Sequence, residues 1–137
     1  LTIEQSDDLK LIEAFLSWMQ KNKKDYTITF RDFTKDPDSL FDDAEGKTWY
    51  EQYQRRLNLE QISPEKRKKM MGQANPKFIL RNYLAQEAIE DAEKSDFTKL
   101  IKLLEVLKNP YAENSEFDDF AKAPPEWGKK LEISCSS

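Results

Sequence analysis

Residues 6–23 read SDDLKLIEAFLSWMQKNK, and this stretch decides the fold class. Apolar side chains recur at spacings of three and four residues, which is the repeat of an α-helix that buries one face. Ser6 and the two aspartates after it provide a cap and negative charge at one end, and lysines from Lys21 onward provide positive charge at the other. The stretch therefore predicts a helix from about Ser6 to Lys23. Its expected apolar face is Leu9, Ile12, Phe15, Leu16 and Met19.

Helical periodicity continues in the next part of the chain. Residues 26–30 alternate like a strand, but Tyr26, Phe30 and Phe33 also recur at helical spacing. In an otherwise helical sequence we interpret this segment as a helix. The acidic residues from Asp36 to Gly46 predict a connection that contains a short helical turn. A further helix is expected through Trp49, Tyr50, Tyr53 and Leu57.

Two X-Pro pairs mark the starts of later helices. Ser63 is a good N-cap, and Pro64 fits the first helical position because its missing N–H costs nothing there. Asn75-Pro76 has the same form and predicts a helix from Pro76 to about Lys94. Ser95 and Asp96 begin another helix, so the two should form an antiparallel hairpin.

The composition agrees with an all-α fold. The chain has 137 residues and only three glycines, and its 12% aromatic content argues against disorder. We predict an irregular bundle of about five to seven helices with an extended C-terminal tail. Residues 1–137 are expected to form a single helical domain or subdomain, in which residues 109–137 are mostly an irregular tail.

Charge and residue usage limit the function. The net charge of −4 provides no general basic field for nucleic acid or anionic membranes, and no apolar run approaches the roughly 18 residues that span a bilayer. The chain has no histidine, which removes the commonest general base and metal ligand. With one cysteine, Cys135, and no Asn-x-Ser/Thr sequon, a cytoplasmic location is expected.

Few residue groups suggest a binding or catalytic site. The acidic segment lacks the glycine and glutamate of a calcium loop, with Phe41 and Lys47 at those positions, so we interpret it as a solvated loop without a metal. Adjacent carboxylates such as Asp118 and Asp119 diverge on a helix and do not predict an acid–base pair. The basic residues are a possible anion or partner contact, although a solvated helix face is the simpler reading. They are Lys66, Arg67, Lys68, Lys69 and Arg81.

Several longer segments resemble one protein family. The strongest are NPKFILRNYLAQ at 75–86, LEVLKNPY at 104–111, PPEW at 124–127 and SCSS at 134–137. They resemble the C-terminal region of the selenoprotein O family, whose bacterial members are also known as YdiU proteins. Residues 25–31 and 49–53 resemble the same family more weakly, so the resemblance spans nearly the whole chain.

The resemblance implies an enzyme. The intact protein would have a kinase-like fold, bind ATP with its phosphates reversed, and transfer AMP to Ser, Thr or Tyr of other proteins with magnesium or manganese. The family's nucleotide and metal residues lie in the kinase-like part, so this segment should have no catalytic residue and no cofactor. Its partners would be the kinase-like domain of the same chain and, for the intact enzyme, the substrate proteins.

Cys135 is the one residue that carries a role from the family. By chemistry alone a lone terminal thiol is more often incidental. The resemblance places it where many eukaryotic members have selenocysteine and thus implies a redox-responsive thiol that pairs with a cysteine of the catalytic part. A cysteine here looks like the bacterial form.

Two other classes of function fit parts of the sequence. A freestanding helical interaction module would hold a partner protein on the Lys66 to Lys69 face or in an apolar groove. Nucleic-acid binding through the same helix would require a basic field that the acidic chain lacks.

Overall fold

The computed structural model describes residue 1 and residues 4–131, and all regular structure in that part of the chain is helical. The predicted all-α class is confirmed. The chain divides into two compact units, Leu1–Asn75 and Pro76–Ser137, which are described separately below. The prediction of one domain stays a prediction.

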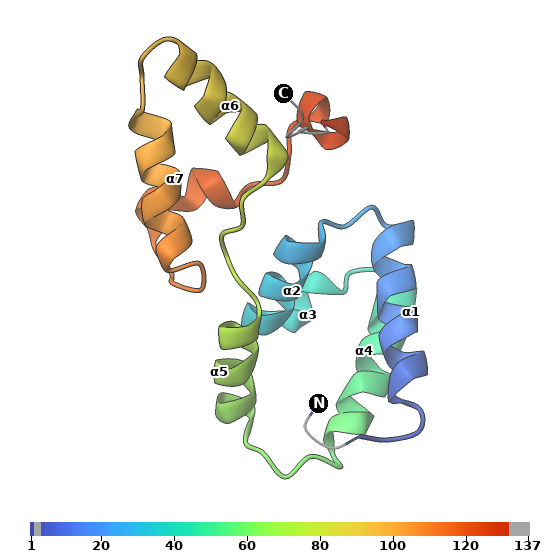
Figure 1. Cartoon of the computed structure of the whole chain (residues 1–137). Helices are drawn as coiled ribbons and strands as arrows, with labels where there is room; N and C mark the ends of the chain where they lie inside the picture. Colours follow the sequence, from blue (N-terminus) through green and yellow to red (C-terminus); the bar gives the residue numbers. More distant parts are fainter. Residues whose placement is uncertain (2–3, 132–137) are drawn as a thin grey trace. The chain divides into compact units, whose positions relative to one another are not determined.

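The first unit consists of five α-helices within its described residues. Helix α1 lies along α4, and α2 contacts both α3 and α5 (Figure 1). The helix predicted at Tyr26 is confirmed, as is the short helical turn in the acidic connection. The elements are α1 (Asp8–Lys21), α2 (Tyr26–Lys35), α3 (Pro37–Leu40), α4 (Ala44–Leu57) and α5 (Pro64–Ala74).

Side-chain caps explain where most of these helices begin. The carboxylates of Asp25, Asp36 and Asp43 and the hydroxyl of Ser63 each accept a hydrogen bond from a first-turn N–H. Ser63 and Pro64 thus start α5 as predicted. Helix α1 differs, because its N-cap residue is Asp7 rather than Ser6 and that side chain caps no N–H.

An aromatic cluster fills the centre of the first unit. The rings of Phe15 and Trp49 stack with centroids 4.5 Å apart, and Phe33 lies 5.0 Å from Tyr53. Stacked and edge-on contacts of this kind add stability beyond the burial of apolar area. The rings come from α1, α2 and α4 and the segment between them, so the cluster joins these elements. Its members are Phe15, Trp18, Phe30, Phe33, Phe41, Trp49, Tyr50 and Tyr53.

The aromatic cluster buries only part of the predicted apolar face of α1. Phe15 and Met19 are buried as expected. The other three predicted core residues, Leu9, Ile12 and Leu16, are 65%, 48% and 40% exposed. Trp18 takes their place in the core at 1% exposure, because the side of α1 that meets the rings runs through residues 15, 18 and 19.

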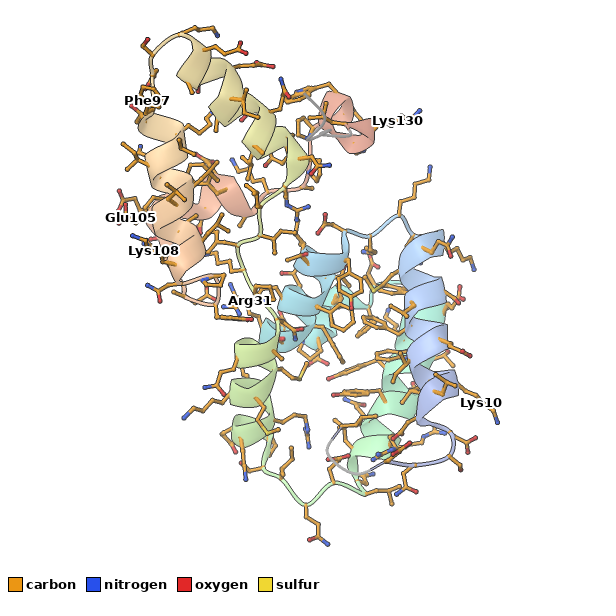
Figure 2. The ribbon with its side chains drawn as sticks, viewed as in Figure 1. Lys10, Arg31, Phe97, Glu105, Lys108 and Lys130 are labelled. Atoms are coloured by element: carbon orange, nitrogen blue, oxygen red, sulfur yellow. The ribbon has the colours of Figure 1, made fainter. Side chains whose placement is uncertain are left out.

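Polar side chains connect elements around the cluster. The guanidinium of Arg31, labelled in Figure 2, donates to the carbonyl oxygens of Gly72 (3.1 Å) and Asn75 (2.8 Å), which joins α2 to the end of α5. Arg56 of α4 donates to both carboxylate oxygens of Asp8 and to Glu60. The hydrogen bond from Arg56 lowers the pKa of Asp8 and keeps this nearly buried carboxylate ionised.

The second unit is a helical hairpin followed by short helices. Helices α6 (Asn82–Glu93) and α7 (Thr98–Lys108) pack against each other after a short connection, which confirms the predicted hairpin (Figure 1). The described part of the tail includes two 3₁₀ helices, η1 (Ser115–Ala121) and η2 (Glu126–Lys130). Apolar residues of α6, α7 and η1 form the core, with Phe120 shared between its two clusters.

The helix predicted to begin at Pro76 is wrong, because α6 begins only at Asn82. The N–H groups of Lys77 and Phe78 both donate to the carbonyl oxygen of Pro110, at 2.8 and 3.0 Å. This pairing belongs to a non-helical segment with a bend at Lys77. Phe78 lies in the core, where it is 1% exposed beside Val106. A tertiary contact therefore overrides the local start signal of Asn75-Pro76.

Phe78→Ala should lower the free energy of unfolding by about 3–5 kcal/mol, because it removes a fully buried ring from the core of the second unit. Phe97→Ala is the matched control, since Phe97 is 52% exposed, and its effect should stay within roughly 0.5 kcal/mol. Urea denaturation followed by circular dichroism measures both. Equal losses for the two variants would contradict the buried placement of Phe78.

Candidate functional site

The basic run predicted as an anion contact lies on α5. Lys66, Lys68 and Lys69 are exposed, whereas Arg67 is half-buried. Helix α5 contains no fully buried residue, so its inner side contacts the rest of the unit only partly. The four basic residues therefore differ in surroundings, and Arg67 is the one that faces the interior.

Arg67 lines two cavities of the first unit. The smaller has a volume of about 230 Å³ and the larger about 390 Å³, and Phe33, Tyr53, Arg67 and Met71 line both. The Nε atom of Arg67 is buried and has no hydrogen-bond partner. The one hydrogen bond that the Arg67 side chain makes within the described residues runs from a terminal guanidinium nitrogen to the carbonyl oxygen of Ile62. It is long at 3.5 Å.

The smaller cavity has a positive border. Lys35, Arg67 and Lys68 line it, and none of its described lining residues is Asp or Glu. The Lys68 ammonium donates to the carbonyl oxygen of Lys35 at 3.1 Å, which keeps it at this border. Burial raises the pKa of the phenols of Tyr50 and Tyr53, so both stay neutral at physiological pH. The basic side chains at this border favour an anion over a cation.

Arg81, the fifth predicted contact residue, belongs to the second unit. It is half-buried and lies directly before the first residue of α6. The neighbouring Asn82 donates to the carbonyl oxygen of Leu131 at 2.9 Å. That bond joins α6 to the chain after η2, so these polar residues contribute to the structure of the second unit.

A third cavity, of about 460 Å³, lies in the second unit and has paired charges. Lys99 lies 3.1 Å from a carboxylate oxygen of Glu87 and 3.5 Å from one of Asp91. Burial alone would lower the pKa of Lys99, but the hydrogen bond and charge of Glu87, together with Asp91, outweigh it and raise that pKa. Lys99 is thus already paired with protein carboxylates.

Aspartates of the acidic connection cap the N-termini of the helices that follow them. Asp36 caps α3 and Asp43 caps α4. The N–H of Gly46 and then the indole N–H of Trp18 lower the pKa of Asp43, whose second oxygen lies 2.8 Å from the Trp18 nitrogen. Within residues 1 and 4–131, no group of three His, Cys, Asp or Glu side chains is placed to hold a metal ion.

Two helices have exposed apolar faces, and that of α1 departs from the predicted core. On α1 the outer face consists of Leu9, Ile12 and Leu16. Helix α7 has a similar face at its N-terminal half, where the exposed side chains are Phe97, Leu100, Ile101 and Leu104. Contiguous apolar faces of this kind mark interaction sites more often than isolated exposed residues do.

Cys135, the predicted redox residue, lies outside the described residues.

The inward position of Arg67 beside the two cavities was not predicted from the sequence, in which the four basic residues look alike. One signal was present: Arg67 precedes Met71 by four residues and so shares a helix face with an apolar side chain. No described helix is both long enough and apolar enough to cross a bilayer.

Comparison with known proteins identifies the family. A family profile described as Protein adenylyltransferase SelO matches residues 1–108. The Protein nucleotidyltransferase YdiU of Yersinia pseudotuberculosis serotype O:1b (strain IP 31758) is 46% identical over 141 residues. Its counterpart in Vibrio parahaemolyticus serotype O3:K6 (strain RIMD 2210633) is 43% identical over 146 residues. This chain belongs to the SelO family.

The SelO relatives are much longer than this chain. The alignments cover 96% of the chain but only 29% and 30% of the two relatives. The resemblance read from the sequence is confirmed. The chain thus spans less than a third of the length of the curated relatives that it matches.

Proposed function

We propose that this chain is the C-terminal helical region of a SelO-type protein AMP-transferase, which moves AMP from ATP to Ser, Thr or Tyr of other proteins. In this proposal the chain holds no catalytic residue. ATP and magnesium or manganese bind in the kinase-like part of the complete protein, and the helical region packs on that part and supports it. The observation that carries the proposal is 46% identity along nearly the whole chain to a relative of which it spans 29%.

The exposed apolar face of α1 supports a packing role. Leu9, Ile12 and Leu16 lie at spacings of three and four residues and are 40–65% exposed. Covering such side chains is worth about 1.5–3 kcal/mol for each one that becomes fully buried. A helical region that packs on a larger domain through this face would gain this stabilisation.

The chain alone should transfer no AMP. We expect no AMP incorporation above background when it is mixed with ATP, manganese and a generic protein acceptor, and clear incorporation with the complete protein. Radiolabelled ATP or mass spectrometry of the acceptor measures both. Transfer by the isolated chain would overturn the non-catalytic role, and inactivity of the complete protein would instead favour an interaction module.

Leu9→Glu should separate the isolated chain from the complete protein. In the chain, Leu9 is 65% exposed, so the melting temperature should hardly change. In the complete protein, a charge at a covered apolar contact should lower the melting temperature by roughly 5 °C. Gln20→Glu adds the same charge at an exposed position of α1 and is the matched control. Identical shifts for both variants in the complete protein would argue against packing through this face.

Cys135 is proposed as the redox-responsive residue of the complete protein. A thiolate that pairs with a cysteine elsewhere in the protein would make AMP transfer depend on the thiol–disulfide state. We expect the rate of AMP transfer to change between oxidising and reducing buffers, and we expect Cys135→Ser to remove that change. The measurement compares rates in oxidised and reduced glutathione. An equal response of the natural protein and the variant would exclude this role.

A further inference from the structure

Arg67 has an unusual environment for an arginine. Its Nε atom, like that of Arg31, is buried without a hydrogen-bond partner. The only hydrogen bond of the Arg67 side chain within the described residues is the 3.5 Å contact to the Ile62 carbonyl oxygen. Buried N–H donors in folded proteins almost always have an acceptor. A charged guanidinium has five such donors arranged as a planar fork, so an acceptor with two oxygens fits it best.

The larger cavity beside Arg67 is apolar. Its walls are mainly aromatic and aliphatic, with Tyr53 and Asn75 as neutral polar members. Among the described residues that line it, Arg67 has the only charged side chain. A volume of about 390 Å³ lies within the range of roughly 300–1,000 Å³ that is typical of small-molecule sites. Mainly apolar walls with a few polar groups are the usual form of a site that binds the body of a ligand by burial and orients it by polar contacts.

The charge of the cavity selects the ligand. One guanidinium in an apolar cavity balances one negative charge, whereas a doubly charged phosphate would bring an uncompensated charge out of water. The cavity in the second unit provides the contrast, since its Lys99 is paired with Glu87 and Asp91. At Arg67, by contrast, none of the described residues that line the larger cavity is Asp or Glu.

We propose that Arg67 binds a carboxylate attached to an apolar body, with the carboxylate on the guanidinium and the body in the 390 Å³ cavity. Two sources have this chemistry. One is a free organic acid with an aliphatic or aromatic tail. The other is an Asp or Glu side chain on an apolar segment of the complete protein, and this second source rests on the function proposed above.

Calorimetric titration of the 137-residue chain with octanoate tests the site itself. We expect saturable binding that is at least about tenfold weaker for octanol, which has the same tail without the charge, and for Arg67→Met. Lys69→Met removes the same charge from an exposed position of α5 that lines neither cavity, and it should bind octanoate like the natural chain. The NMR signal of the Arg67 Nε–H should shift on binding, and circular dichroism confirms that the variants are folded.

Repeating the titration with the complete protein distinguishes the two sources. Octanoate binding that depends on Arg67 there would assign the site to a free acid. Absence of binding, together with a lower melting temperature for Arg67→Met than for Lys69→Met, would assign the carboxylate to the protein itself.

Three results with the isolated chain would overturn the proposal. They are failure of the isolated chain to bind octanoate, equal affinity for octanol, and unchanged binding by Arg67→Met. Absence of binding to the complete protein without a stability difference between the variants would also overturn it. None of these measurements involves AMP transfer, so their failure is distinguishable from failure of the proposed function.

Discussion

The packing of aromatic rings around Phe33 is the constraint on which the first unit depends. Phe33 contacts Phe15, Trp49 and Tyr53, which come from α1 and α4, so its ring can be enclosed only when α2 lies against both helices. The indole N–H groups add direction, since that of Trp49 donates to the Leu11 carbonyl at 2.8 Å and that of Trp18 to Asp43. Gly46 leaves the necessary room, because a Cβ there would lie 3.0 Å from Trp18 and from Phe41.

The same packing explains why α1 has a second apolar side. An α-helix turns by about 100° per residue, so residues 15, 18 and 19 lie on one face and Leu9, Ile12 and Leu16 on the neighbouring face. The two faces meet where Ile12 and Met19 lie seven residues apart. The rings can cover only the first of these. Residue type alone does not tell which of two apolar sides faces the core, so the periodicity of α1 predicts the helix correctly and its buried face only in part.

Local signals predicted local structure. Ser63 and Pro64 begin α5 because the cap and the fixed proline φ act within one turn. Asn75-Pro76 carries a similar signal but begins no helix, because the N–H groups of Lys77 and Phe78 bind the carbonyl of Pro110, far along the chain. Burial of Phe78 and the two hydrogen bonds to Pro110 stabilise the non-helical segment. Such a contact between distant residues cannot be derived from the residues around Pro76.

The candidate site shows the same limit at the level of single side chains. Lys66, Arg67, Lys68 and Lys69 look equivalent in sequence, and as a group they indicate only a positive surface. Successive helical residues point in different directions, so only one of four consecutive positions faces the aromatic cluster, and here it is Arg67. Exposed lysines interact with anions through solvent and are screened by salt. A guanidinium beside apolar walls interacts at shorter range and loses its hydration, so its chemistry is more selective than that of the run to which it belongs.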